Sequence, residues 1–305
     1  MNIDPVYLIE RKKHKSLINK LKLGIVLVSL AFCAILLQQD QMSFLKDANI
    51  SDYIAVIKID KVILEDSIRD KAIEKVRKDD KAKAVILTIN SPGGTVTGSE
   101  KVYHLLKDIA KQKPVVCLME GMAASGGYMI ALASDYIIAH NTTITGSIGV
   151  VRQMPEITDA LEKLGITYHA FKSNKLKASP NPFEKLTDDV KEVAMESILD
   201  IYDFFVDLVV SNRKISKPDA IKIADGRIYT GRQAYKYHLI DQIGTFDDAK
   251  KWLYDVKKID KEIKLVEVDL EENPSITKKM FLPLRNQLLN LLSFAQNTAS
   301  QFFFF

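Results

Sequence analysis

The stretch AVILTINSPGG, residues 84–94, decides the fold class. It begins as a run of aliphatic and β-branched residues, which is typical of a buried strand, and it ends in Ser-Pro-Gly-Gly, which favours a tight turn. Helical spacing of apolar residues precedes it at 67–78 and follows it at 97–111. Strands that alternate with helices of this length indicate an α/β protein with a parallel or mixed sheet.

Strands and helices continue to alternate along the chain. The same patterns predict a further set of elements, namely strands at 53–59, 114–119 and 136–139 and helices at 125–133 and 187–213. Thr187 and Asp188 open the last of these helices, where a capping residue belongs. No Gly- or Pro-rich linker interrupts 53–270, so we expect one α/β domain over these residues.

The positive charge of the chain is concentrated at its N-terminal end. Lys and Arg number 43 and Asp and Glu 39, which gives a formal charge of +4. Residues 1–22 hold six basic and two acidic residues, so they carry the whole excess and residues 23–305 are neutral. A nucleic-acid-binding protein is expected to carry its basic stripe on the folded domain, and the distribution therefore argues against nucleic acid as a partner.

An apolar run follows the basic segment. Residues 23–37 (LGIVLVSLAFCAILL) hold no charge, and two glutamines extend the uncharged stretch to 39. A spanning helix needs about 20 residues and a signal-peptide core about 7–15, so an uncleaved anchor and a signal peptide both remain open. The sequence favours the anchor, because no small-residue cleavage site is obvious after it. The positive-inside rule then places residues 1–22 in the cytoplasm and the domain on the outer side, after a linker at 40–52.

The C-terminal tail, 271–305, is apolar again. It contains FLPLRNQLLNLLSF at 281–294, whose leucines would form one helical face, and it ends in four phenylalanines. Two interpretations remain open for this tail, a helix that packs on a partner subunit and a second contact with lipid.

Two glycine-rich turns mark the places where chemistry could occur. SPGG at 91–94 ends one expected strand, and GMAASGGY at 121–128 follows the next. Free N–H groups of the first turn could hold an oxyanion, and Ser125 stands among small residues that leave room for a substrate backbone. Each pattern also has a structural interpretation, a turn that needs glycine in the first case and a serine helix cap in the second.

A serine nucleophile needs a base, and none of the histidines falls in a motif that supplies one; they are His14, His104, His140, His169 and His238. A lysine can serve when burial lowers its pKa from about 10.4 to about 7–8. The SxxK patterns at 43–46 and 211–214 are best explained by chance, since they stand in a linker and at a lysine-rich helix end. Cys33 and Cys117 lie in apolar runs and offer neither a disulfide nor a metal site, and we expect no cofactor.

Four segments occur in the order found in a known family. They are INSPGGTVTGSE (89–100), GMAASGGYMIALASD (121–135), TGSIGV (145–150) and FKSNKLKASPNPFEKLT (171–187). Together they resemble the SppA-type signal peptide peptidases, which are membrane-anchored serine proteases related in fold to ClpP and the crotonases. The resemblance covers about 53–250. It implies an α/β fold of the ClpP/crotonase-like type, a spiral of ββα units, preceded by one N-terminal transmembrane helix.

The family works with a Ser/Lys dyad. The resemblance implies Ser125 as the nucleophile and Lys177 as the general base, with Lys175 as the alternative because the alignment is loosest in this segment. It implies three further roles, which are oxyanion-hole donors at Gly94 and Gly126 and a hydroxyl that orients the lysine at Ser147.

The resemblance also implies partners and a location. Short members form homo-oligomeric rings in which the serine of one subunit meets the lysine of its neighbour, and their substrates are remnant signal peptides in the bacterial cytoplasmic membrane. The N-terminal helix would contact lipid and hold the catalytic domain on the extracytoplasmic side. Three alternatives remain open: a SohB-like or stomatin-partner protease that cuts a protein segment, a non-catalytic assembly protein, and an acyl-CoA enzyme on the same fold.

Overall fold

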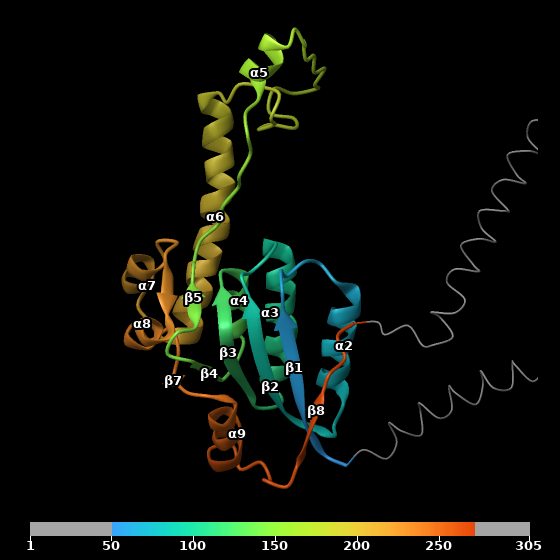
Figure 1. Cartoon of the computed structure of the whole chain (residues 1–305), viewed down its shortest axis with the longest axis vertical. Coiled ribbons are helices and arrows are strands. Elements are labelled where there is room, and N and C mark those ends of the chain that lie inside the picture. Colours follow the sequence, from blue (N-terminus) through green and yellow to red (C-terminus); the bar gives the residue numbers. More distant parts are fainter. Residues whose placement is uncertain (1–50, 272–305) are drawn as a thin grey trace, which may run out of the picture. The chain divides into compact units, whose positions relative to one another are not determined.

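The computed structural model describes residues 51–271, in which helices cover both faces of a central sheet (Figure 1). The predicted basic segment 1–22, the anchor 23–39, nearly all of the linker 40–52 and the tail beyond 271 lie outside the described residues. The strands are β1 (Tyr53–Asp60), β2 (Ala82–Ser91), β3 (Val115–Ala124), β4 (Tyr136–Ala139), β5 (Ile144–Gly146), β6 (Ile228–Thr230), β7 (Gln242–Ile243) and β8 (Lys264–Glu267).

The sheet is mostly parallel. Its order is β6-β5-β3-β2-β1-β8, with β4 beside β3 and β7 beside β4, and the β5–β6 pair alone among these is antiparallel. Strand β2 is buried along nearly its whole length, which agrees with its uninterrupted apolar run and its place between β1 and β3. The described residues therefore form a mixed α/β fold around a mainly parallel sheet.

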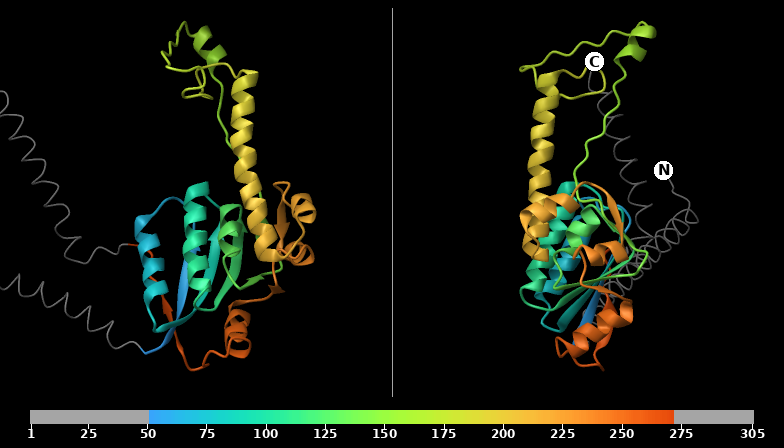
Figure 2. Two further views of the ribbon diagram at one scale, coloured as in Figure 1. Left: turned by 180° about the vertical axis from the view of Figure 1, so that it is seen from behind. Right: turned by 90° about the vertical axis from the view of Figure 1, so that its left-hand side faces the viewer.

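The helices are α2 (Ser67–Lys78), α3 (Val96–Ala110), α4 (Gly126–Ala131), α5 (Thr158–Lys163), α6 (Asp188–Arg213), α7 (Lys217–Ile223), α8 (Gly231–Lys236) and α9 (Phe246–Asp255). Two views from opposite sides show α2 and α3 on one face of the sheet (Figures 1 and 2). Helix α9 covers the other face, where Leu253 packs among Ile54, Ile86 and Leu118. Alternate residues of each strand point to opposite faces, so one apolar run serves both layers.

Side-chain caps fix where two of the helices begin. The Asp66 carboxylate accepts from the N–H groups of Ile68 and Arg69 at the start of α2, and Thr95 Oγ1 accepts from Gly98 N at the start of α3. Thr187 stands at the predicted capping position of α6, but its hydroxyl donates to Asp189 and makes no capping bond to the backbone. Helix α6 therefore begins within one residue of the predicted start, but the predicted capping residue makes no side-chain hydrogen bond to the helix backbone.

The long predicted elements are confirmed, and the short ones show where sequence patterns lose resolution. Helix α2 has the predicted bounds, and α6 begins one residue later than predicted. Strand β3 continues to Ala124, five residues beyond the predicted end at 119, because small residues of GMAA pair with β5. The four-residue strand β4 has the predicted bounds, whereas strands of two or three residues, such as β5 and β7, are too short for an alternating pattern to be recognised.

Residues 151–187, which we call the arm, connect β5 to α6 and carry α5. From β5 the arm first runs alongside α6, and α5 with the loops around it lies at the end of α6 that is farther from the sheet, as both views of Figure 2 show. Tyr168 stacks on Phe183 within the arm, with 5.1 Å between ring centroids, and Ile157 N donates to Pro182 O. None of its residues is buried, although several are large and apolar, Phe171 being 99% exposed.

One property of the helices bears on membranes. Between residues 51 and 271, none of them combines the length and the apolar character that a bilayer-spanning helix requires.

We expect Tyr128→Phe to lower the free energy of unfolding by about 1–3 kcal/mol, because it leaves a buried carbonyl without its donor. The Tyr128 ring in α4 is fully buried, and its hydroxyl donates to Leu239 O at 2.9 Å. Tyr235→Phe is the matched control, since that side chain is 52% exposed and its hydroxyl makes no hydrogen bond among the described residues. Urea denaturation measures the free energy of unfolding of both variants. Equal stability of the two would contradict a stabilising role of the hydrogen bond from Tyr128 to Leu239 O.

Candidate active site

Strand β3 changes its neighbour halfway along its length, and this places two serines side by side. Its first half pairs with β4, from Val116 to Met119, and its last three residues pair with β5. Ala124 is opposite Gly146 at the end of this second ladder, so the next residues are Ser125 and Ser147. Neighbouring strands are about 4.8 Å apart, and both serines therefore leave the sheet at one edge.

The backbone of Ser125 is held in a strained conformation. Its φ of 51° and ψ of −120° lie in a region that L-residues rarely adopt and that costs about 1–3 kcal/mol. The hydrogen bond from Ser125 N to Gly146 O, at 2.8 Å, fixes the residue there. Although Ser125 stands at the N-cap position of α4, its side chain makes no capping bond, so the helix-cap interpretation is wrong. The hydroxyl is left available at a half-buried position.

The Ser-Pro-Gly-Gly turn lies directly against Ser125. Gly93 has a φ of 105°, and a Cβ there would lie 2.8 Å from Gly126 N and 3.0 Å from Ser125 Cβ. A Cβ on Gly94 would lie 1.8 Å from Ile63 O. Both positions therefore require glycine, which confirms the interpretation of SPGG as a turn that needs glycine.

The same turn also leaves an amide unused. Among residues 51–271, the N–H of Gly94 donates no hydrogen bond. Gly94 N lies 3.3 Å from the point that a Cβ on Gly126 would occupy, and Gly126 N belongs to the first turn of α4, where N–H groups have no partner within the helix. Two amide nitrogens thus lie close to the backbone of Ser125 and Gly126, and amide donors are what an oxyanion requires.

Ser147 lies on the same edge. Its φ is 49°, its N–H donates to Arg227 O at 2.8 Å, and its side chain is half-buried. The structure therefore brings together four of the five predicted site residues: Ser125, Ser147, Gly94 and Gly126.

Lys177 is not near these residues within one chain. It lies in the arm, where its own N–H donates to Asn174 O and its side chain is exposed. The part of α6 that is buried against the body begins at Phe205, and the arm joins α6 at Asp188. The 17 residue-to-residue steps from Asp188 to Phe205 measure about 25 Å at about 1.5 Å per step. Figure 1 shows the same separation between α4 and the arm.

The other lysines of this segment have ionic partners. Lys175 Nζ lies 2.7 Å from Asp189, and this pairing helps to hold the pKa of Asp189 at about 2. Lys172 is ion-paired with Glu184 and donates to Ser179 Oγ at 2.9 Å, which closes the loop that presents residues 173–178. The ammonium of Lys177 has no ion pair among the described residues.

Sequence patterns missed two contributors to the site. The loop that contains Ile63 pairs with the Gly93–Gly94 turn through an isolated parallel bridge, and it follows β1 without any motif. Ser99 of α3 is fully buried, and its Oγ lies 2.1 Å from where a Cβ on Gly126 would be. Ile63 carries no signal in periodicity or motif spacing, whereas Ser99 lies within the quoted segment 89–100 and was not singled out there. Within the part of the chain that the structure describes, no three metal-binding side chains converge.

Comparison with known sequences decides the family. The profile of peptidase family S49 matches residues 107–260, about half of the chain, a range that includes Ser125, Ser147 and both candidate lysines. The chain belongs to peptidase family S49. It is a member of the SppA-type group of serine peptidases.

Similar proteins occur in bacteria and archaea. A candidate protease of Methanocaldococcus jannaschii is 40% identical over 204 residues, which is 67% of this chain and 65% of that protein. Protease 4 of Haemophilus influenzae is 34% identical over 67% of this chain and 35% of its own length. A candidate signal peptide peptidase SppA of Enterococcus faecium is 38% identical over 61% of this chain and 55% of its own. The matches thus span less than two thirds of each of these relatives.

We expect Gly126→Ala to destabilise the protein by about 1–3 kcal/mol, because the new Cβ overlaps Ser99 Oγ in a packed interior. The second variant, Ser99→Gly, removes both of the nearest atoms that the new Cβ would meet. The double variant should therefore be more stable than the sum of the two single effects predicts. Denaturant unfolding of all four proteins measures the coupling, and strict additivity would contradict the contact.

Proposed function

We propose that this protein is a membrane-anchored serine endopeptidase with a Ser/Lys dyad, which degrades remnant signal peptides. The observation that carries the proposal is the strained, uncapped Ser125 beside the unused N–H of Gly94. Membership of family S49 supports a serine nucleophile at this position. The name of the Enterococcus relative supports the substrate class.

The chemistry follows from the positions of these groups. Ser125 Oγ attacks the carbonyl carbon of the scissile bond, and its proton passes to a neutral lysine amine. In this proposal the oxygen that becomes negative is stabilised by the N–H groups of Gly94 and Gly126. The lysine then protonates the leaving amine, and water releases the acyl group from Ser125 by the same steps in reverse order. Ser147 orients the lysine amine.

We propose that the base reaches Ser125 from a neighbouring subunit. The arm that carries Lys177 is about 25 Å along α6 from the body of its own chain. The arm has no buried residue of its own, and it exposes large apolar side chains, among them Phe171, Leu164 and Ile166. Exposed apolar patches of this kind mark interaction sites, so the arm is suited to pack on a second copy in a ring.

Lys177 is the proposed base and Lys175 the alternative. Lys177 has no ionic partner among the described residues, whereas Lys175 must first leave Asp189. Both lie on the loop that the Lys172–Ser179 hydrogen bond closes, so one docking geometry would present either of them.

The proposed location follows from the charge pattern alone. A basic segment before an apolar run at 23–39 supports an anchor with the domain outside the cytoplasmic membrane, close to signal peptides that remain in the bilayer.

We expect a mixture of full-length Ser125→Ala and full-length Lys177→Ala, each inactive alone, to recover about a quarter of wild-type cleavage of an apolar fluorogenic peptide. One junction in four of a randomly mixed ring pairs an intact serine with an intact lysine. The control pairs Ser125→Ala with the double variant Ser125→Ala/Lys177→Ala and should stay silent.

Other outcomes of this mixing have definite meanings. Full activity of Lys177→Ala alone would contradict the choice of lysine, and Lys175→Ala would then be expected to abolish cleavage. Silence of co-assembled, folded mixtures with either lysine variant would contradict a dyad shared between subunits.

A further inference from the structure

The orientation of the Gly94 N–H depends on the peptide group that it shares with Gly93. A trans peptide is planar, so its C=O and N–H point in opposite directions. Ile63 N donates to Gly93 O at 2.8 Å, so this bond directs the Gly93 carbonyl toward Ile63 and the Gly94 N–H to the opposite side. Two consecutive glycines offer little resistance to a flip of this peptide. The loop that contains Ile63 therefore decides whether the oxyanion donor is present.

Within this loop, residues 61–66, apolar burial acts at Ile63 alone. Ile63 is buried, but its neighbours Val62 and Leu64 are 57% and 55% exposed. The backbone of Ile63 is tied to the turn by a second bond, from Thr95 N to Ile63 O at 2.9 Å. Strand β2 holds the start of the loop, where Ser91 Oγ donates to Lys61 O and Lys61 N donates to Asn90 O at 3.2 Å. Polar contacts from two helices add further restraint at Leu64 and Glu65.

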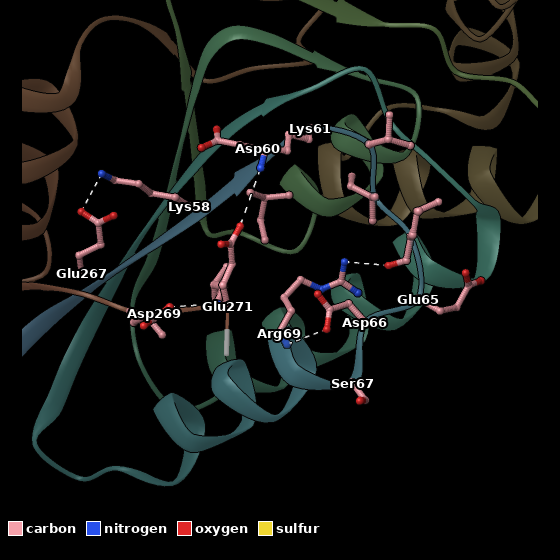
Figure 3. A pocket seen from close by; sticks show the side chains of 16 residues that line it. Lys58, Asp60, Lys61, Glu65, Asp66, Ser67, Arg69, Glu267, Asp269 and Glu271 are labelled. Carbon is pink, nitrogen blue, oxygen red and sulfur yellow. Dashed lines mark hydrogen bonds and ion pairs between the residues drawn. The ribbon is translucent and has the colours of Figure 1, made fainter. Parts of the chain in front are cut away.

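Arg69 of α2 supplies one of these contacts. Its guanidinium donates to Leu64 O at 2.9 Å and points toward the loop from the helix (Figure 3). The side chain is 9% exposed, and Asp70 Oδ1 accepts from Arg69 Nε at 3.1 Å and from Nη2 at 2.9 Å. Lys101 Nζ lies 2.9 Å from Asp70 Oδ2. The guanidinium is thus fixed from one side, so the loop carbonyl is bound by a donor that cannot swing away.

Glu65 supplies the other contact. Its carboxylate accepts from the hydroxyls of Thr97 and Thr95, the latter at 3.0 Å. The hydrogen bond from Thr97, above all, lowers the pKa of Glu65, so the carboxylate stays charged. Thr95 is also the residue that caps α3 and that binds Ile63 O. Glu65 therefore joins the loop to the residue that follows Gly94.

We propose that Arg69 and Glu65 are positioning residues that hold loop 61–66 in register with the Gly93–Gly94 turn and thereby keep the Gly94 N–H directed at the oxyanion. The inference rests on the proposed peptidase function, and it assigns neither residue a contact with the reacting atoms. Loss of either contact releases the loop and allows the peptide to rotate. The rate of the chemical step then falls, while the ground-state binding of peptide is unaffected.

The test compares Arg69→Met and Glu65→Ala with Arg77→Met in the full-length protein. Arg77 is the matched control, because it lies on the same helix and forms a two-pronged pair with Glu74 at 2.6–2.7 Å without contact to the loop. The first readout is the rate of Ser125 labelling by a fluorophosphonate. The second compares inhibition by a peptide aldehyde, whose adduct places an oxyanion in the site, with inhibition by the matching alcohol, which forms no adduct.

We expect both variants to label and cleave about tenfold more slowly or worse, because loss of a whole oxyanion donor costs about 100- to 1,000-fold. KM and inhibition by the alcohol should stay within about twofold, and inhibition by the aldehyde should weaken in step with kcat. Arg69→Lys should restore part of the rate, because its ammonium can still donate to a carbonyl. Arg77→Met should behave as wild type.

Each remaining outcome has a separate meaning. If Arg69→Met does not fold, the exposed Glu65 carries the test through Glu65→Ala and Glu65→Gln, whose side chains do not support the core. Wild-type labelling rates in folded variants would overturn the inference, as would an equal loss of aldehyde and alcohol binding. Absence of Ser125 labelling in the wild-type protein would instead overturn the proposed function.

Discussion

The change of partner along β3 is the constraint on which the rest of the site depends. A parallel strand normally keeps one neighbour on each side, yet β3 leaves β4 after Met119 and takes β5 at Met122. Ala123 and Ala124, which pair with Thr145 and Gly146, leave room for this close approach of β5. The hydrogen bond from Ser125 N to Gly146 O then ends the ladder and forces the nucleophile into its unusual backbone conformation. Sheet topology therefore determines the exposure of a single hydroxyl.

Glycines also allow the two turns around Ser125 to approach each other. Gly93, Gly94 and Gly126 each stand where a Cβ would collide with backbone or with a buried side chain. Two chain segments that lie far apart in sequence are thereby brought close enough for their amides to share one point. The direction of the Gly94 N–H then depends on the hydrogen bond from Ile63 N to the carbonyl of the same peptide group, Gly93 O. The polar contacts of loop 61–66 matter because apolar burial of that loop is slight.

The sequence was sufficient for the elements whose patterns are long, and insufficient for those made by tertiary pairing. Strand β2 and helix α2 could be predicted because their patterns are long, an uninterrupted apolar run in β2 and helical spacing over the 12 residues of α2. The end of β3 could not, because GMAASGG has no apolar alternation and its extended form comes from pairing with β5. Ser125, Ser147, Gly94 and Gly126 were found through a family resemblance and lie together in the structure. The role of loop 61–66 left no trace in the sequence, since a hydrogen bond to a backbone carbonyl places no demand on residue type.

The separation of serine and lysine has a physical consequence if the base comes from a neighbour, as we propose. An isolated chain then holds a nucleophile and an oxyanion hole without a proton acceptor, and it is harmless to other proteins during synthesis and sorting. The arm that carries the lysine has no core of its own, so its order depends on the surface that it meets. Assembly would therefore supply two things at once, the burial that the exposed apolar side chains of the arm lack and the base that Ser125 lacks. Catalysis would then require a correctly docked neighbour, because a lysine that is misplaced by even a few ångströms cannot accept the proton from Ser125.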